Sequence, residues 1–197
     1  MRQDLSIIAD WIRPQTRVLD LACGDGELLG YLQQHKQVSG YGLEIDAEKI
    51  TACIANGVDV IEQDLNRGLS NFADASYDTV IMTQALQVLR RQDLALDEML
   101  RVGQEAIVTF PNFAHWRCRL YLTFRGKLPV SKTLPYEWYD TPNIHLITFK
   151  DFEALCAAKG LKILDRAVGD LAYKGHWKAR LWPNLFGEVA IYKLGRA

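Results

Sequence analysis

The chain alternates short apolar runs with longer segments in which apolar side chains recur every three or four positions. Short runs are typical of strands buried in a parallel sheet, and the longer period is typical of helices that bury one face. We expect strands at residues 18–21, 38–45, 58–62, 77–83, 106–110, from 161 onward and at 185–194. We expect helices at residues 5–12, 27–35, 47–55, 94–102, 116–124 and 148–157. This order predicts an α/β fold with helices on both faces of a mostly parallel sheet.

The composition of the chain limits the class of protein. With 197 residues and no repeat or interdomain linker, we expect one domain over residues 1–197. A formal net charge of -1 argues against nucleic acid as the main partner. Cys23, Cys53, Cys118 and Cys156 lack metal-ligand pairing and fit a reduced cytoplasm. The first residues lack the apolar core of a signal peptide, and no apolar run is long enough to span a membrane.

A glycine-rich turn links the first expected strand to the helix that follows it. Asp20 ends the strand, and Glu27 begins the helical pattern. Between them, Gly24 and Gly26 allow the backbone to turn sharply and to approach a ligand closely. The turn therefore presents free N–H groups at a helix N-terminus, at the carboxyl end of a central strand. This is where nucleotides bind in open α/β sheets.

The spacing of the glycines distinguishes between kinds of nucleotide. Neither register of G-x-G-x-x-G/A fits, because its third position is Leu29 or Glu27, and there is no G-K-[ST] of a phosphate loop. The stretch resembles motif I of the class I S-adenosylmethionine (SAM) methyltransferases, with Ala22 in place of the usual first glycine. SAM has no phosphate, so its loop needs close backbone approach and a carboxylate rather than a lysine. The resemblance rests on Asp20, the run Cys23-Gly24-Asp25-Gly26 and Glu44 at the end of the next strand.

This resemblance implies a Rossmann-like fold whose sheet has seven strands, the last of them antiparallel. It also implies that the glycine-rich loop contacts SAM or S-adenosylhomocysteine (SAH). The loop residues that would make these contacts are Asp20, Ala22, Cys23, Gly24 and Gly26.

The same resemblance implies cofactor contacts at the ends of the next strands. Glu44 would bind the ribose hydroxyls, with Ile45 beside it. Asp64 would meet the adenine amino group, and Leu65 would pack on the adenine ring. Gln84, after the fourth strand, would touch the cofactor, but an amide does no acid–base work at neutral pH. Two alternatives stay open: Glu44 as a solvated acid at a strand end, and Asp64 as a helix cap or turn residue.

An irregular insertion of residues 112–147 follows the fifth strand. Long insertions in compact domains are usually functional, and aromatic residues and arginines are enriched at interface hot spots. Three interpretations are open: aromatic residues simply buried on the edge of the sheet, a lid over a substrate pocket, and a docking surface for another protein. The aromatic and basic residues of the insertion include Phe113, His115, Trp116, Arg117, Arg119, Tyr121, Phe124, Arg125, Lys127, Lys132, Tyr136, Trp138 and Tyr139.

Three further stretches are not general features of methyltransferases. They are residues 110–117, 134–145 and 184–188, and with them nearly the whole chain resembles the MetW family of methionine-biosynthesis proteins. The resemblance implies a cytoplasmic protein that acts beside homoserine O-acyltransferase, the MetX-type acetyl- or succinyltransferase. It further implies that the protein supports or regulates that enzyme in a complex.

No residue is an evident catalyst of methyl transfer. The histidines have no metal-ligand spacing, and His145, the best catalytic candidate among them, is more simply a structural histidine. We therefore expect a site that senses SAM or SAH and an insertion that transmits its state to the acyltransferase. One alternative is a SAM-dependent methyltransferase that acts on a small molecule or protein, since methyl transfer can run on proximity alone. Another is an RNA methyltransferase that uses the basic stretches 117–132 and 174–180.

Overall fold

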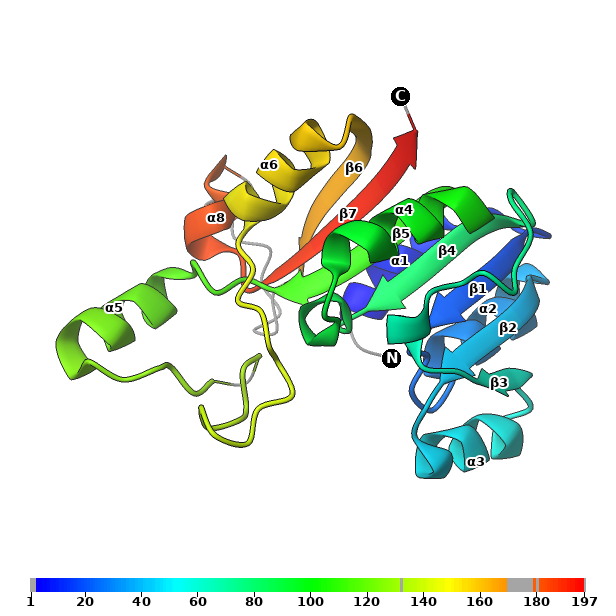
Figure 1. Cartoon of the computed structure of the whole chain (residues 1–197), viewed down its shortest axis with the longest axis horizontal. Coiled ribbons are helices and arrows are strands. Elements are labelled where there is room, and N and C mark those ends of the chain that lie inside the picture. Colours follow the sequence, from blue (N-terminus) through cyan, green and yellow to red (C-terminus); the bar gives the residue numbers. More distant parts are fainter. Residues whose placement is uncertain (1–2, 132, 170–178, 180, 197) are drawn as a thin grey trace.

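One sheet contains the strands β1 (Arg17–Leu21), β2 (Ser39–Glu44), β3 (Val60–Glu62), β4 (Tyr77–Thr83), β5 (Gly103–Pro111), β6 (Leu161–Gly169) and β7 (Val189–Arg196) (Figure 1). In this computed structural model, which describes residues 3–131, 133–169, 179 and 181–196, their order is β3-β2-β1-β4-β5-β7-β6. Neighbours are parallel from β3 to β5, and β7 is antiparallel to β5 and β6. Six strands share one direction, so the expected seven-stranded sheet with an antiparallel last strand is confirmed.

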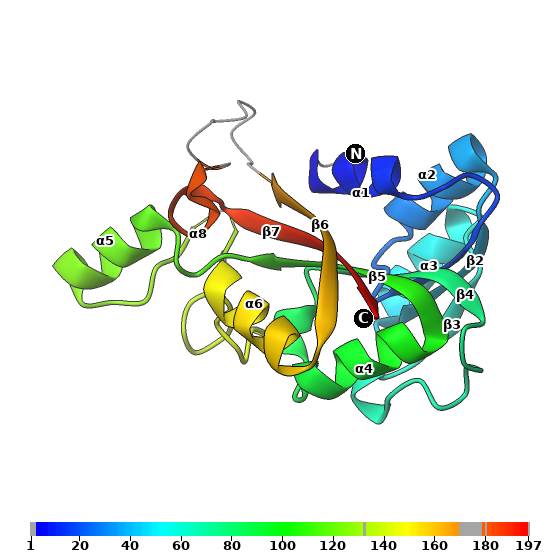
Figure 2. The same ribbon diagram turned by 90° about the horizontal axis from the view of Figure 1, so that it is seen from above.

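Helices cover both faces of the sheet, as expected (Figure 2). One face packs against α1 (Gln3–Trp11), α2 (Glu27–Lys36) and α3 (Ala47–Ala55), and the other against α4 (Gln92–Val102) and α6 (Phe149–Ala158). Other helical elements among the described residues are η1 (Leu65–Arg67), η2 (Leu86–Val88), α5 (Trp116–Arg125) and α8 (Pro183–Phe186). Within the described residues, no helix has the length and apolar character needed to cross a membrane.

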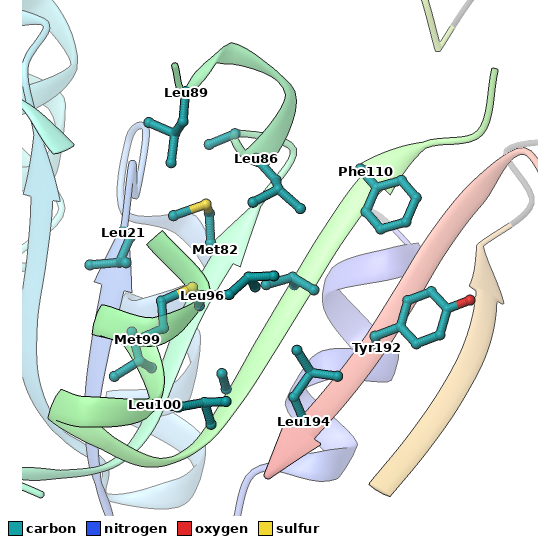
Figure 3. Close-up of a cluster of buried hydrophobic side chains, with 14 of the residues drawn as sticks. Leu21, Met82, Leu86, Leu89, Leu96, Met99, Leu100, Phe110, Tyr192 and Leu194 are labelled. Carbon is teal, nitrogen blue, oxygen red and sulfur yellow. The ribbon is translucent and has the colours of Figure 1, made fainter. Parts of the chain in front are cut away.

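Each central strand contributes side chains to two separate cores, because successive side chains of a strand point to opposite faces. In β1, Leu19 and Leu21 belong to the cluster that includes α4 and α6, whereas Val18 belongs to the cluster that includes α1 and α2. Figure 3 shows the first cluster, where side chains from β1, β4, β5 and β7 meet those of α4. Burial on both faces explains the nearly continuous apolar runs in the sequence.

The helix ends follow local signals in the sequence. The Asp46 carboxylate accepts hydrogen bonds from two backbone N–H groups in the first turn of α3, at 2.9 and 3.3 Å. Thr148 Oγ1 accepts one from the N–H of Asp151 at the start of α6, at 3.2 Å. These oxygens satisfy N–H groups that have no partner inside the helix. Asp and Thr are both favoured at the N-cap position, so the starts of α3 and α6 follow from the residue types there.

Two strands begin later than the sequence pattern predicts. β3 begins at Val60 rather than at residue 58, because the buried Val58 packs against the glycine-rich loop. β7 begins at Val189 rather than at residue 185, because Pro183 opens the helix α8 instead. Proline suits the first turn of a helix, where its fixed φ fits and its missing N–H is not needed.

The insertion of residues 112–147 leaves the sheet at the end of β5 and returns to it at α6. Its helix α5 projects well beyond the ends of β5 and β7 (Figures 1 and 2). The basic stretch expected at residues 174–180 lies outside the described residues, except for Ala179.

An aromatic cluster joins β5, β7 and α6. The ring of Phe110, which is fully buried, lies 4.9 Å from that of Phe152 and 6.1 Å from that of Tyr192 between centroids. The Tyr192 hydroxyl donates a hydrogen bond to Glu153 Oε1 at 2.8 Å. The one polar atom of the three rings therefore has a hydrogen-bond partner. This cluster fixes the end of β5 from which the insertion departs.

We expect Phe110→Ala to lower the free energy of unfolding by about 3–5 kcal/mol, because it removes a buried ring and leaves a cavity. Phe124→Ala in α5, where the side chain is 79% exposed, is the matched control and should change it by no more than about 0.5 kcal/mol. Denaturant unfolding of both variants measures the difference. Equal losses would contradict the assignment of the core.

Candidate functional site

A pocket of about 760 Å³ lies at the carboxyl ends of β1, β2 and β4. Its volume is within the range of small-molecule sites. One side is formed by the loops that follow β1, β2 and β4, and the other by the insertion through Thr133, Pro135, Tyr136, Pro142 and Asn143. The pocket is therefore at the edge of the sheet where an open α/β fold binds its ligand.

The β1–α2 loop takes left-handed backbone conformations at three positions. Ala22 has φ 54°, Gly24 has φ 65° and Gly26 has φ 76°. A Cβ at Gly24 would meet no atom within 4 Å, whereas one at Gly26 would lie 3.1 Å from Val58 Cγ2. Gly24 therefore leaves its backbone open toward the pocket, and Gly26 allows close packing against the residue before β3. Ala22 keeps a glycine-type conformation at a cost of about 1 kcal/mol.

The carboxylate of Glu44 holds two loops together. Its Oε2 accepts a hydrogen bond from the N–H of Gly24 at 3.0 Å. Its Oε1 accepts hydrogen bonds from the N–H groups of Ile45 and Asp46 at 2.8 and 3.1 Å. The side chain is buried and lines the pocket. Because a carboxylate has about four acceptor positions, a ligand hydroxyl can still donate to it.

Asp20 is a buried acidic group at the end of β1. It is 1% exposed, and its Oδ1 has no hydrogen-bond partner among the described residues. Burial raises the pKa of Asp20 to about 7, and the negative charge of Glu44 adds to this effect. A ligand that brings a positively charged donor would satisfy Oδ1 and favour the ionised carboxylate.

Two glutamines connect the end of β4 to the insertion. Gln84 has φ 54°, and its N–H donates to Thr109 Oγ1 at 3.0 Å. The side chain of Gln87 is buried, its Nε2 donates to the Gln84 carbonyl at 2.7 Å, and its Oε1 has no partner among the described residues. The Gln87 carbonyl accepts the N–H groups of Ile144 and His145, both at 3.1 Å. Gln87 thus lines the pocket and also anchors the insertion by backbone hydrogen bonds.

Two cysteines meet behind the glycine-rich loop, a contact that the sequence did not predict. The Sγ atoms of Cys23 and Cys53 lie 3.6 Å apart, and Cys53 Sγ donates to the Gly24 carbonyl at 3.1 Å. Burial raises the pKa of both thiols, so they stay protonated and act as small packing groups that support the loop. No three His, Cys, Asp or Glu side chains come together as a metal site in the part of the chain that the structure describes.

The structure brings most of the predicted cofactor contacts together, but not all of them. Seven line the pocket: Asp20, Ala22, Cys23, Gly24, Glu44, Ile45 and Gln84. Gly26, Asp64 and Leu65 do not line it. Asp64 Oδ1 accepts hydrogen bonds from the backbone N–H and the side-chain amide of Asn66, at 2.9 and 3.0 Å. Its role toward adenine stays a prediction, as does that of Leu65, which packs against the core.

Several residues that line the pocket were not predicted as ligand contacts. Asp25 and Asp46 had a local signal, because each follows a predicted contact by one or two positions. The residues of the insertion, and Gln87, had none, because their place depends on how the insertion folds back. The unpredicted lining residues include Asp4, Asp25, Asp46, Lys49, Gln87, Thr133, Pro135, Tyr136, Pro142 and Asn143. His145 is not among the lining residues.

The chain is similar to proteins of methionine biosynthesis. It matches the family described as "Methionine biosynthesis protein MetW" over residues 2–194. A "Bifunctional methionine biosynthesis protein MetXA/MetW" from Rhodopirellula baltica is 32% identical over 202 residues, which cover 98% of this chain. The chain spans 32% of the length of that curated relative.

Solved structures share the fold at low sequence identity. The magnesium protoporphyrin IX methyltransferase ChlM from Synechocystis, with bound SAH, has a TM-score of 0.68 and 17% identity, covering 99% of this chain and 83% of that chain. A SAM-dependent methyltransferase from Archaeoglobus fulgidus has a TM-score of 0.67 and 16% identity, covering 96% of this chain and 90% of that chain. These similarities establish the class I methyltransferase fold.

The raised pKa of Asp20 predicts a specific dependence of stability on pH. Between its ordinary pKa of 3.8 and its folded pKa of about 7, the folded state holds a proton that the unfolded state has lost. This contribution to stability is therefore full below about pH 4 and is lost as the pH rises through 7. Without ligand, Asp20→Asn should gain about 2–3 kcal/mol relative to wild type between about pH 5 and pH 8. Denaturant unfolding at both pH values tests this, and a constant difference would contradict it.

Proposed function

The chain belongs to the MetW family, and we propose that it binds SAM or SAH and regulates the homoserine O-acyltransferase of methionine biosynthesis as its partner. The observation that carries the ligand part is the buried Oδ1 of Asp20, which has no hydrogen-bond partner among the described residues and feels the charge of Glu44. SAM offers an ammonium group, ribose hydroxyls and no phosphate. A pocket with two carboxylates and an open glycine backbone suits that set of groups.

Each predicted contact has a defined part in this proposal. The carboxylate of Asp20 pairs with the ammonium group of the ligand. Gly24 lets the backbone approach the ligand, together with the other loop residues Ala22, Cys23 and Gly26. Glu44 accepts hydrogen bonds from the ribose hydroxyls, and Gln84 touches the cofactor from the end of β4. The adenine contacts are assigned to Ile45, Asp64 and Leu65.

The partner part of the proposal is supported by the bifunctional relative. The name of that relative joins MetXA and MetW in one polypeptide, and the present chain covers 32% of its length. Joining two units in one chain raises their effective concentration for each other, which favours a direct contact. We extend this contact to a separate acyltransferase. The proposal places the complex in the cytoplasm, in keeping with four free cysteines.

The insertion is the element that we propose to transmit the state of the pocket. We treat residues 1–197 as a single domain and residues 112–147 as a lid on it. The lid contributes to the pocket wall through Tyr136 and Asn143, and it also carries α5 at the outside of the molecule. A ligand that contacts the lid can favour one of its arrangements, and a partner bound to the lid then responds.

A SAM-dependent methyltransferase acting on a small molecule or protein is the second candidate function. It is favoured by the extension of the pocket from the glycine-rich loop to the lid, which offers space for an acceptor beside the cofactor. Formation of SAH from SAM distinguishes the two functions, since a regulator needs only to bind the ligand.

We expect Gly24→Ala to weaken SAM and SAH binding by about ten-fold or more, because the added methyl group occupies open space at a residue that lines the pocket. Gly57→Ala is the matched control. Gly57 has φ 73°, a Cβ there would also meet nothing within 4 Å, and it does not line the pocket. Both variants should lose about 1 kcal/mol of stability from backbone strain. Calorimetric titration measures binding, and equal affinity in wild type and Gly24→Ala would refute the site.

The regulatory role predicts that the affinity of the acyltransferase for this protein changes with saturating SAM or SAH by about five-fold or more. Linkage requires the acyltransferase to change the affinity for SAM or SAH by the same factor. Titrations in both directions measure the two factors. The sensor idea is wrong if the complex forms with the same affinity with and without ligand, whereas the partnership itself would stand.

A further inference from the structure

The helix α5 has almost no cover from the other residues that the structure describes. Cys118 is its only buried residue. Figures 1 and 2 show it as an arm beyond the ends of β5 and β7, with no other labelled helix or strand on its outer side. Its exposed large apolar side chains are Trp116, Leu120, Tyr121, Leu122 and Phe124. A contiguous exposed apolar surface of this kind marks an interaction site in a folded protein.

The apolar side chains follow a helical stripe. Trp116, Leu120 and Phe124 are spaced by four positions, so they lie one above another on the same face of α5. Leu128 and Val130, which follow the helix, are also exposed. Helices that bind in a groove of a partner use anchors at such spacing.

The charged side chains of the helix itself are all basic. The sequence contains no Asp or Glu between Glu105 and Glu137. Arg125 and Lys127 are exposed at the end of the helix and just after it, and Arg117, also exposed, has its guanidinium 3.7 Å from Glu188 Oε1. A partner that covers the stripe must therefore offer an apolar groove with carboxylates at its rim. A second copy of this chain does not fit, because two such helices would bring like charges together.

We propose that α5 is the docking helix for the acyltransferase, with the stripe of Trp116, Leu120 and Phe124 in an apolar groove edged by acidic residues. This inference rests on the proposed function, which supplies the partner. The chain itself supplies the chemistry of the interface: apolar anchors, aromatic rings and a cationic rim. The same insertion reaches the pocket through Thr133 and Tyr136, a few positions after α5.

The test is the affinity of Phe124→Glu for the homoserine O-acyltransferase of the same organism. Phe124 is 79% exposed, so a carboxylate there does not disturb the core. It places negative charge in an acidic groove, and we expect binding about ten-fold weaker or more. Ile54→Glu on α3 is the matched control, because Ile54 is 66% exposed on a helix far from α5 (Figure 1). This variant should bind the acyltransferase as tightly as the wild type does. Both variants should keep the SAM affinity of the wild type.

The outcomes separate this proposal from the function on which it rests. Equal affinity of wild type and Phe124→Glu for the acyltransferase overturns the docking helix and leaves the partnership intact. No binding by the wild type overturns the partnership and the docking helix together. Vesicles of anionic phospholipid provide the last comparison: if Phe124→Glu loses binding to them but keeps the acyltransferase, α5 is a membrane-surface helix and the docking proposal is wrong.

Discussion

The site depends on the hydrogen bond that the Glu44 carboxylate accepts from the Gly24 N–H. Gly24 lies in the loop after β1, and Glu44 is the last residue of the neighbouring strand β2, so the bond fixes the loop after β1 against the end of β2. A buried carboxylate is costly unless it is well hydrogen-bonded, and here backbone N–H groups of Gly24, Ile45 and Asp46 meet that need. The loop conformation and the charge of the pocket are therefore set by one side chain.

The Glu44 carboxylate also affects which charge the pocket favours in a ligand. Burial of Asp20, and after it the negative charge of Glu44, raises the pKa of Asp20 to about 7. Two acidic groups that lie this close disfavour a second anion and favour a cationic ligand. Cys23 and Cys53 fill the space behind the loop with small, protonated groups, so no competing charge is added from that side. The electrostatics of the site thus follow from its packing.

Features that depend on neighbours in the sequence were predictable, and features that depend on the path of a long loop were not. The strands, the caps at Asp46 and Thr148 and the glycine-rich loop were visible in the sequence because each has a local physical cause. The contact between Cys23 and Cys53 joins positions thirty residues apart. The insertion reaches the pocket with the help of backbone hydrogen bonds to the Gln87 carbonyl. No local sequence pattern predicts these bonds. Asp64 and Leu65 came from a family pattern, and the pocket does not include them.

Coupling between the pocket and a partner on α5 demands little energy. A ten-fold change in affinity corresponds to about 1.4 kcal/mol, and one hydrogen bond contributes about 1 kcal/mol net. The buried Oε1 of Gln87 has no partner within the described residues, and the Gln87 carbonyl holds Ile144 and His145 of the insertion. A ligand that donates to this oxygen would act on the residue that anchors the lid. In the proposed regulation, one or two such contacts would supply the coupling between the pocket and α5 without a large rearrangement of the sheet.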